Sequence, residues 1–271
     1  MNASSSVSFP IVDAKLARRV ELAQAAQNRS TTPPGGILEV AGGVALFAGA
    51  GSPLSQALAL GLDGPVRAED LARVEAHLGQ AGGPIQVELL PFADPSLAVL
   101  LAQRGYRVTE FQQVLIRPLD GPLPDAPAAD VRPVRSGEEA LWAHTLAQAF
   151  FGREEVAPEE SSLILPATRA RGTTCFLAQV DGQPAGGGTV AIHEDIATLS
   201  GTGVRERFRG RGLQAALIRA RMEWAIRHGC RLVATSTHVA TPSQRNMERM
   251  GFRIAYPKLV LVREAPASPV A

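Results

Sequence analysis

An arginine- and glycine-rich segment, residues 204–214, constrains this chain more than any other feature. It reads Val-Arg-Glu-Arg-Phe-Arg-Gly-Arg-Gly-Leu-Gln, and it lies between a strand-like run, 196–204, and a helix-like run, 213–228. A glycine-rich turn that opens a helix leaves several backbone N–H groups without partners, and the helix N-terminus favours anions. Arginines at alternate positions bring positive charge to the same turn. The segment therefore predicts a site for a phosphate or pyrophosphate group.

Two common phosphate-binding patterns fit this segment poorly. A Walker A loop requires Lys followed by Ser or Thr after its last glycine, where this chain has Leu213 and Gln214. A dinucleotide-binding fingerprint requires a third glycine, and an acidic residue about 20 positions later, after a second strand. Neither an ATP-type loop nor a dinucleotide fold is therefore predicted.

The segment instead resembles the acetyl-CoA loop of the GNAT superfamily of N-acetyltransferases. The family pattern, Arg/Gln-x-x-Gly-x-Gly/Ala, places Arg209 and Gly212 in register and puts Gln214 where Gly or Ala is usual. A second register, from Arg207 through Gly210, also fits the letters but places the strand end less well. The resemblance implies that the loop amides hold the pyrophosphate of acetyl-CoA, which is the co-substrate.

The elements expected around the loop follow the family order. Apolar residues after the loop recur with a helical period, interrupted by arginines that we expect to be exposed. Apolar runs bounded by turn residues predict strands. The expected order is a strand from 130, a helix over 137–151, a hairpin of 174–180 and 185–192, the strand 196–204, the loop, the helix 213–228, a strand over 232–237, a short helix from 242 to 250 and a strand over 258–263. This order predicts the α/β (α+β) class, with a mixed, mostly antiparallel GNAT-type sheet flanked by helices.

The chain also carries an internal repeat, which predicts two tandem GNAT-like domains. Asp94-Pro95-Ser96 leads a helix that ends in Gly105-Tyr106, as Thr241-Pro242-Ser243 leads one that ends in Gly251-Phe252. The first half has no cation between Val44 and Arg67, so we interpret it as a degenerate half that has lost cofactor binding. An unrelated α/β domain with similar turns is the alternative. The predicted divisions are an N-terminal helix and linker, 1–36, a degenerate domain, 37–118, a proline-rich linker, 119–129, an acetyl-CoA-binding domain, 130–265, and a tail, 266–271.

Composition narrows the classes of partner. The 271 residues carry a formal net charge of +1, which gives no reason to expect a nucleic acid or an anionic membrane as a partner. The N-terminus lacks the pattern of a signal peptide and no apolar run approaches about 20 residues, so we expect a cytoplasmic protein. Cys175 and Cys230 lack metal-ligand spacing, and we expect no metal. The sequence leaves a monomer and a homodimer equally open.

The resemblance also assigns the cofactor contacts. In the family, a bulge near the end of the strand before the loop splays two parallel strands, and the pantetheine arm lies in that gap. Residues 200–204, Ser-Gly-Thr-Gly-Val, match such a place because glycines permit a bulge and a close backbone approach. Asn246, on the short helix, is either a pantetheine contact or an ordinary exposed residue. The predicted cofactor-binding residues are Val204, Arg209, Gly210, Arg211, Gly212, Leu213, Gln214 and Asn246.

The acid and the base are the least defined part of the site. Many GNAT enzymes carry a tyrosine on the short helix, four residues before its Gly-Phe, where this chain has Met247. The strand before the loop also lacks a carboxylate. His238 is the candidate catalytic residue, because an imidazole titrates in the useful range. A loop histidine with no catalytic role, a catalytic water and Tyr256 are the alternatives.

The sequence as a whole predicts an acetyl-CoA-dependent N-acetyltransferase. The acetyl group would pass to the amine of a small molecule by direct attack on the thioester. A non-catalytic acyl-CoA-binding sensor or scaffold, and an acetyltransferase that acts on a protein amine, are the alternative functions.

Overall fold

The computed structural model describes residues 8–49, 52 and 54–264, and the chain divides into two compact units. The C-terminal unit comprises Met1–Ile11 and Leu115–Ile254, and the N-terminal unit comprises Val12–Val114 and Ala255–Ala271. The boundaries of these units fall inside two long strands, β5 (Arg107–Pro118) and β11 (Arg253–Arg263). These units are defined by contacts in space, whereas the predicted divisions at 36, 118, 129 and 265 are defined by the sequence repeat and the linker. Those divisions therefore stay a prediction. The predicted tail, 266–271, lies outside the described residues.

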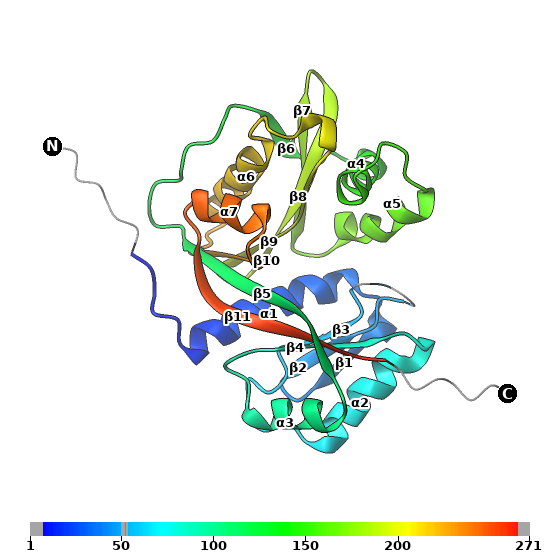
Figure 1. Cartoon of the computed structure of the whole chain (residues 1–271). Helices are drawn as coiled ribbons and strands as arrows, with labels where there is room; N and C mark the ends of the chain where they lie inside the picture. Colours follow the sequence, from blue (N-terminus) through cyan, green and yellow to red (C-terminus); the bar gives the residue numbers. More distant parts are fainter. Residues whose placement is uncertain (1–7, 50–51, 53, 265–271) are drawn as a thin grey trace. The chain divides into compact units, whose positions relative to one another are not determined.

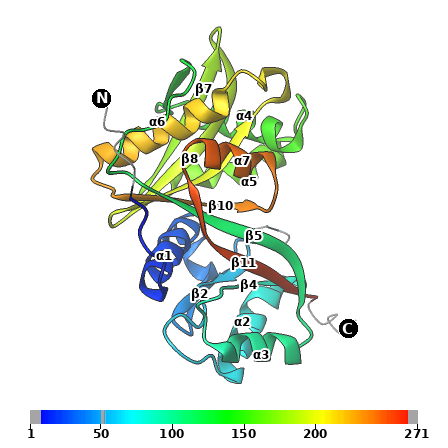
Figure 2. The same cartoon turned by 60° about the vertical axis from the view of Figure 1, so that its left-hand side comes forward.

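The C-terminal unit is a sheet with helices on both faces (Figures 1 and 2). The pairs β6–β7, β7–β8 and β8–β9 are antiparallel, whereas β9 and β10 are parallel. The helices α4 and α5 cover one face, and α6 and α7 cover the other (Figure 1). The strands in sheet order are β6 (Asp130–Pro133), β7 (Thr173–Val180), β8 (Gln183–His193), β9 (Ile196–Val204), β10 (Leu232–His238) and the end of β5. The helices are α4 (Glu139–Phe151), α5 (Pro158–Ile164), α6 (Leu213–Arg227) and α7 (Pro242–Arg249), with the 3-10 helices η3 (Leu165–Arg169) and η4 (Glu206–Phe208). The predicted fold class is confirmed.

Three consecutive glycines in β8 let helices approach both faces of the sheet. A Cβ added to Gly187 would lie 2.6 Å from Nε1 of Trp142, which belongs to α4. A Cβ added to Gly188 would lie 2.8 Å from Nη1 of Arg221, which belongs to α6. Successive residues of a strand point to opposite faces, so any side chain here would displace one helix or the other.

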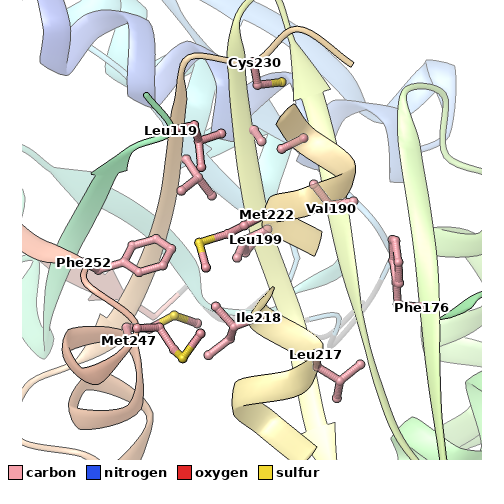
Figure 3. Packing of buried hydrophobic residues seen from close by; sticks show 14 of the residues in the cluster. Leu119, Phe176, Val190, Leu199, Leu217, Ile218, Met222, Cys230, Met247 and Phe252 are labelled. Atoms are coloured by element: carbon pink, nitrogen blue, oxygen red, sulfur yellow. The ribbon is translucent and has the colours of Figure 1, made fainter. Parts of the chain in front are cut away.

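The main core of the C-terminal unit lies between its sheet and the helices α6 and α7. Figure 3 shows Met222 and Ile218 of α6 close to Phe252 and Met247. Met247 is 3% exposed, so the position that carries a tyrosine in many GNAT enzymes belongs to the core here. A methionine there packs but supplies no acid.

From β1 onward, the N-terminal unit repeats the order of elements that the C-terminal unit shows from β7 onward, as the internal repeat predicts. Its strands β3 and β4 are parallel, like β9 and β10, and its other described pairs are antiparallel. The N-terminal helix expected within residues 1–36 is α1, which extends to Thr31. The elements are α1 (Ala14–Thr31), β1 (Ile37–Val40), β2 (Gly43–Leu46), β3 (Gln56–Leu58), α2 (Ala68–Leu78), β4 (Ile85–Leu89) and α3 (Pro95–Gln103), followed by β5, with the 3-10 helices η1 (Pro34–Gly36) and η2 (Gly79–Ala81).

The last strands of the two halves are exchanged. β11, from the end of the sequence, pairs antiparallel with β4, with Leu259 opposite Leu89 and Arg263 opposite Ile85. The end of β5, from the first half, lies beside β10, and the N–H of Leu119 donates to the carbonyl of Arg231 at 2.9 Å. Each half of the sequence therefore adds part of its last strand to the unit built mainly from the other half.

Candidate functional site

β9 and β10 separate near their ends, where the sequence predicts a gap for the pantetheine arm. The parallel register joins Ile196 to Leu232 and ends with Thr198 opposite Ala234. β9 then continues to Val204 and β10 to His238. The register does not extend beyond this pair, and we call the region between residues 199–204 of β9 and 235–238 of β10 the splay.

A bulge in β9 lies beside the splay. The pairs Gly187–Gly203 and Thr189–Ser200 leave two residues of β9 opposite the single residue Gly188 of β8. Gly201, in the bulge, has a φ of +56°, a conformation that favours glycine. Such a bulge bends a strand and re-aims its backbone groups. The bulge expected within residues 200–204 is therefore confirmed.

The backbone beyond the bulge directs the Val204 amide toward the splay. The N–H of Arg205 donates to the carbonyl of Ala185 in β8 at 2.9 Å. Backbone N–H groups of successive strand residues point to opposite sides, so the Val204 N–H faces away from β8. This direction fits the predicted contact between Val204 and the pantetheine arm, which stays a prediction.

A cavity of about 310 Å³ lies at the N-terminus of α6. It contains every predicted cofactor-binding residue except Arg211, whose guanidinium lies 5.7 Å from the ring centroid of Phe208. The structure adds Phe208 and Ala215, which the sequence analysis missed. The residues that line the cavity are Val204, Phe208, Arg209, Gly210, Gly212, Leu213, Gln214, Ala215 and Asn246.

Helix α6 presents unused donors to this cavity. Gly212 is its N-cap, with a φ of +74°, and the first intrahelical bond runs from the Ala216 N–H to the Gly212 carbonyl at 3.1 Å. The N–H groups of 213–215 precede that bond and have no intrahelical partner. A helix N-terminus of this kind suits a phosphate group.

The arginines of the loop divide into two groups. Arg205 is buried and forms an ion pair with Glu154, while Nε of Arg207 lies 3.6 Å from the same carboxylate. Arg209 is exposed beside the cavity, and its Nε donates to the Val204 carbonyl at 3.2 Å. In the part of the chain that the structure describes, Arg209 has no ion pair with a carboxylate. Its positive charge is therefore less neutralised than the charges of Arg205 and Arg207.

Gln214 links the start of α6 to α7 across the cavity. Its Oε1 accepts a hydrogen bond from Nδ2 of Asn246 at 2.6 Å. Both side chains line the cavity. The residue that departs from the family pattern thus engages the side chain that the resemblance assigns to the pantetheine arm.

The structure places the catalytic candidates outside the cavity lining. His238 is exposed at the end of β10, and its carbonyl accepts a hydrogen bond from Oγ1 of Thr241 at 2.9 Å. Tyr256 lies in the N-terminal unit, where its hydroxyl donates to Oε1 of Glu21 at 2.8 Å. Burial, more than its neighbouring carboxylates, raises the pKa of Tyr256. Tyr256 is therefore committed to a buried network, whereas the role of His238 stays a prediction.

The corresponding loop of the N-terminal unit carries a negative charge. Asp63, between β3 and α2, pairs with Arg18, and the second contact, from Nη2 to Oδ2, is 2.8 Å long. The hydrogen bond from Arg18 holds the pKa of Asp63 below its ordinary value, so the carboxyl is ionised. A carboxylate at this point opposes a phosphate group. The interpretation of the first half as degenerate is consistent with this charge.

Two other properties concern metals and membranes. Among residues 8–49, 52 and 54–264, no group of three or more His, Cys, Asp or Glu side chains is placed to hold a metal ion. Within the same residues, no helix has the length and apolar character needed to cross a bilayer.

Comparison with known proteins gives a family match and a shared fold. Residues 139–252 match the family described as Acetyltransferase (GNAT) family. A GCN5-related N-acetyltransferase from Kribbella flavida superposes with a TM-score of 0.65 and 19% identity, over 93% of this chain and 96% of that one. A tandem GNAT protein from the clavulanic acid biosynthesis pathway gives 0.63 and 17%, over 95% and 96%. Among curated proteins, none matches this chain by sequence.

Proposed function

We propose that this protein is an acetyl-CoA-dependent N-acetyltransferase acting on the amine of a small molecule, because residues 139–252 match the GNAT acetyltransferase family. The observation that carries this proposal is the cavity at the N-terminus of α6. Its unused N–H donors and the exposed charge of Arg209 suit the pyrophosphate of a coenzyme. The splay beside it offers backbone groups to an extended arm.

The chemistry assigns a role to each part of this region. The amine nitrogen bonds to the thioester carbonyl carbon, the carbon–sulfur bond breaks, and the thiolate takes up the proton that the nitrogen loses. The α6 donors and Arg209 hold the diphosphate, and the Val204 N–H pairs with the pantetheine arm. His238 or a water molecule relays the proton.

A non-catalytic acyl-CoA sensor is the second candidate function. It is favoured by the buried Met247 at the usual tyrosine position, by the absence of a carboxylate from β9, and by the buried network around Tyr256. Calorimetry with acetyl-CoA, followed by thiol release with a panel of small amines and a lysine peptide, separates the functions. Binding without thiol release on any amine supports the sensor, and release with the peptide alone supports a protein acceptor. A protein that does not bind acetyl-CoA contradicts all three.

Replacing Arg209 with alanine should weaken acetyl-CoA binding. A charge-assisted hydrogen bond to phosphate contributes about 1–3 kcal/mol, so the Kd should rise about 5- to 150-fold at low ionic strength. Salt screens exposed charges, so the effect should shrink at high ionic strength. Calorimetry at two salt concentrations measures it. The matched control is Arg171→Ala, which removes an exposed arginine before β7. Equal losses in both variants would contradict the assignment.

Replacing Gln214 with alanine should instead strengthen binding. In the wild-type protein, the hydrogen bond from Nδ2 of Asn246 to Gln214 competes with a hydrogen bond from Nδ2 to the pantetheine arm. Removing this competition of about 1 kcal/mol should lower the Kd for acetyl-CoA roughly fivefold. Gln214→Glu has nearly the same shape but places a negative charge beside the phosphates, and it should weaken binding. Calorimetry with both variants tests the pair. Changes of the same sign in both would refute this reading of the cavity.

A further inference from the structure

Arg221 of α6 carries a buried charge. Its residue is 0% exposed, and among the residues that the structure describes no carboxylate forms an ion pair with it. The sequence predicts exposed arginines on α6, and at this position that prediction is wrong. Burial lowers the pKa of Arg221 to about 9, which leaves the guanidinium charged at neutral pH. A buried, unpaired charge lowers the stability of the folded state, so a role other than stabilisation would explain its presence.

The guanidinium of Arg221 lies against the β9 bulge. Its Nη1 donates to the Thr189 carbonyl of β8 at 3.0 Å and to the Ser200 carbonyl of β9 at 3.3 Å. Its Nε donates to the Leu217 carbonyl of its own helix at 2.9 Å, and Nη2 has no hydrogen-bond partner in the described part of the chain. Arg221 thus supplies donors where the bulge interrupts the ladder between β8 and β9. Gly188 leaves the room that the guanidinium fills.

The bond to Ser200 fixes the orientation of one peptide plane. In a trans peptide, the carbonyl and the following N–H point in opposite directions. The Ser200 carbonyl also accepts from Oγ1 of Thr189 at 3.1 Å, so it faces β8. The N–H of Gly201 therefore points away from β8, and β10 is the neighbour of β9 on that side. That N–H faces the splay.

We infer that Arg221 is a positioning residue for acetyl transfer, which holds the Ser200–Gly201 peptide so that the Gly201 N–H donates to the thioester carbonyl oxygen. This inference rests on the proposed function, because it requires an acyl-CoA in the splay. A donor fixed before the reaction stabilises the charge that develops on that oxygen. The guanidinium does not touch the substrate but acts through the backbone. The pyrophosphate contacts, at the other end of the coenzyme, do not depend on it.

Infrared spectroscopy of bound acetyl-CoA, isotope-labelled at the thioester carbonyl carbon, tests the inference without knowledge of the acceptor. In the wild-type protein, the carbonyl band should lie below its frequency in solution because the Gly201 N–H polarises the bond. In Arg221→Met, the band should move back toward the solution frequency, while the Kd for acetyl-CoA stays within about twofold. With an amine found in the panel, kcat should fall on the order of tenfold or more, with little change in KM. Arg227→Met, the same substitution at an exposed arginine of α6, should leave all three unchanged.

The outcomes separate the inference from the proposed function. An unchanged carbonyl band in Arg221→Met, or an equal change in Arg227→Met, overturns the role of Arg221. A wild-type protein that does not bind acetyl-CoA overturns the proposed function itself. If Arg221→Met does not fold, Arg221→Lys decides. Lysine is shorter than arginine and lacks the Nε donor that anchors the side chain to the Leu217 carbonyl, so it should hold the Ser200 carbonyl less firmly, and its band should lie between those of the wild-type and free thioester. If Arg221→Lys folds and its thioester carbonyl band has the same frequency as in the wild-type protein, the inference is also overturned.

Discussion

Replacing Lys258 with methionine should lower the free energy of unfolding of the N-terminal unit by about 3–5 kcal/mol. Lys258 is buried in β11, and its Nζ lies 2.8 Å from Oε2 of Glu88 and 3.8 Å from Oε2 of Glu21. Burial disfavours the ammonium, but the two carboxylates outweigh this effect and raise the pKa of Lys258. Methionine would leave the carboxylates buried without a cation. Urea unfolding followed by far-ultraviolet circular dichroism measures the loss. Tryptophan fluorescence would not report on the N-terminal unit, because Trp142 and Trp224 both lie in the C-terminal unit.

The chain offers a matched control for this substitution. Its other lysine, Lys15, is exposed on α1, so Lys15→Met makes the same chemical change without burying a charge. Exposed substitutions of this kind usually change stability by less than about 0.5 kcal/mol. Similar losses in the two variants would contradict the account given for Lys258.

Glu21, the second carboxylate beside Lys258, makes the stability of the N-terminal unit depend on pH. Burial is the main cause that raises the pKa of Glu21 above its ordinary 4.5. The folded state therefore keeps a proton that the unfolded state releases, and the free energy of unfolding falls as pH rises from 4.5 through the folded pKa. Glu21→Gln imitates the protonated group and should remove this part of the pH dependence. A slope that persists in Glu21→Gln would assign it to another group.

Replacing Gly210 with aspartate should weaken acetyl-CoA binding by about 2 kcal/mol, or roughly thirtyfold in Kd, relative to asparagine at the same position. Gly210 lines the cavity with a φ of +77°, and a Cβ added to it would meet no atom within 4 Å. Asn and Asp both tolerate this left-handed conformation better than most residues. The two variants have the same shape, so their difference reports the charge beside the diphosphate. Calorimetry measures both affinities, and equal affinities would remove the diphosphate from this corner.

Gly212 is a poorer position for the same test. Its φ is +74°, and an added Cβ would lie 2.4 Å from Cγ of Pro127, in the segment between β5 and β6. Any side chain at Gly212 would therefore disturb the packing of this segment against the loop. A loss of binding in such a variant would mix charge with distortion.

The sequence predicted elements well where the pattern is local. The strand over 196–204 agrees with β9 to the residue and the helix over 213–228 agrees with α6 to within one residue, because apolar periodicity and turn residues mark their ends. β11 begins at Arg253, several residues before the predicted strand, because its first part alternates between exposed and buried residues without an apolar run. The exchange of β5 and β11 was not predicted, because pairing between distant segments leaves no local pattern.

In the candidate site too, features that depend on neighbouring residues in the sequence were predicted, and features that depend on tertiary contacts were not. The cavity lining follows from the loop, because residues adjacent in sequence surround a helix N-terminus together. Phe208 was missed because an aromatic residue within an arginine-rich run gives no sign of its burial. Arg221 was missed for a related reason: a charged residue on a helix predicts exposure, and only the contacts of β8 and β9 show the opposite. Buried polar side chains that depend on tertiary contacts are what sequence patterns report least.

The placement of β11 has a consequence for protein synthesis. Residues 12–114 of the N-terminal unit leave the ribosome before residues 115–254 of the C-terminal unit, but the strand that pairs with β4 is translated after both segments. Until then the nascent chain has an open edge along β4, of the kind that promotes aggregation. Contacts between segments so far apart in the chain also form slowly. The N-terminal unit therefore completes its sheet only after the C-terminal half has been translated, and folding during translation begins with a sheet that still lacks a strand.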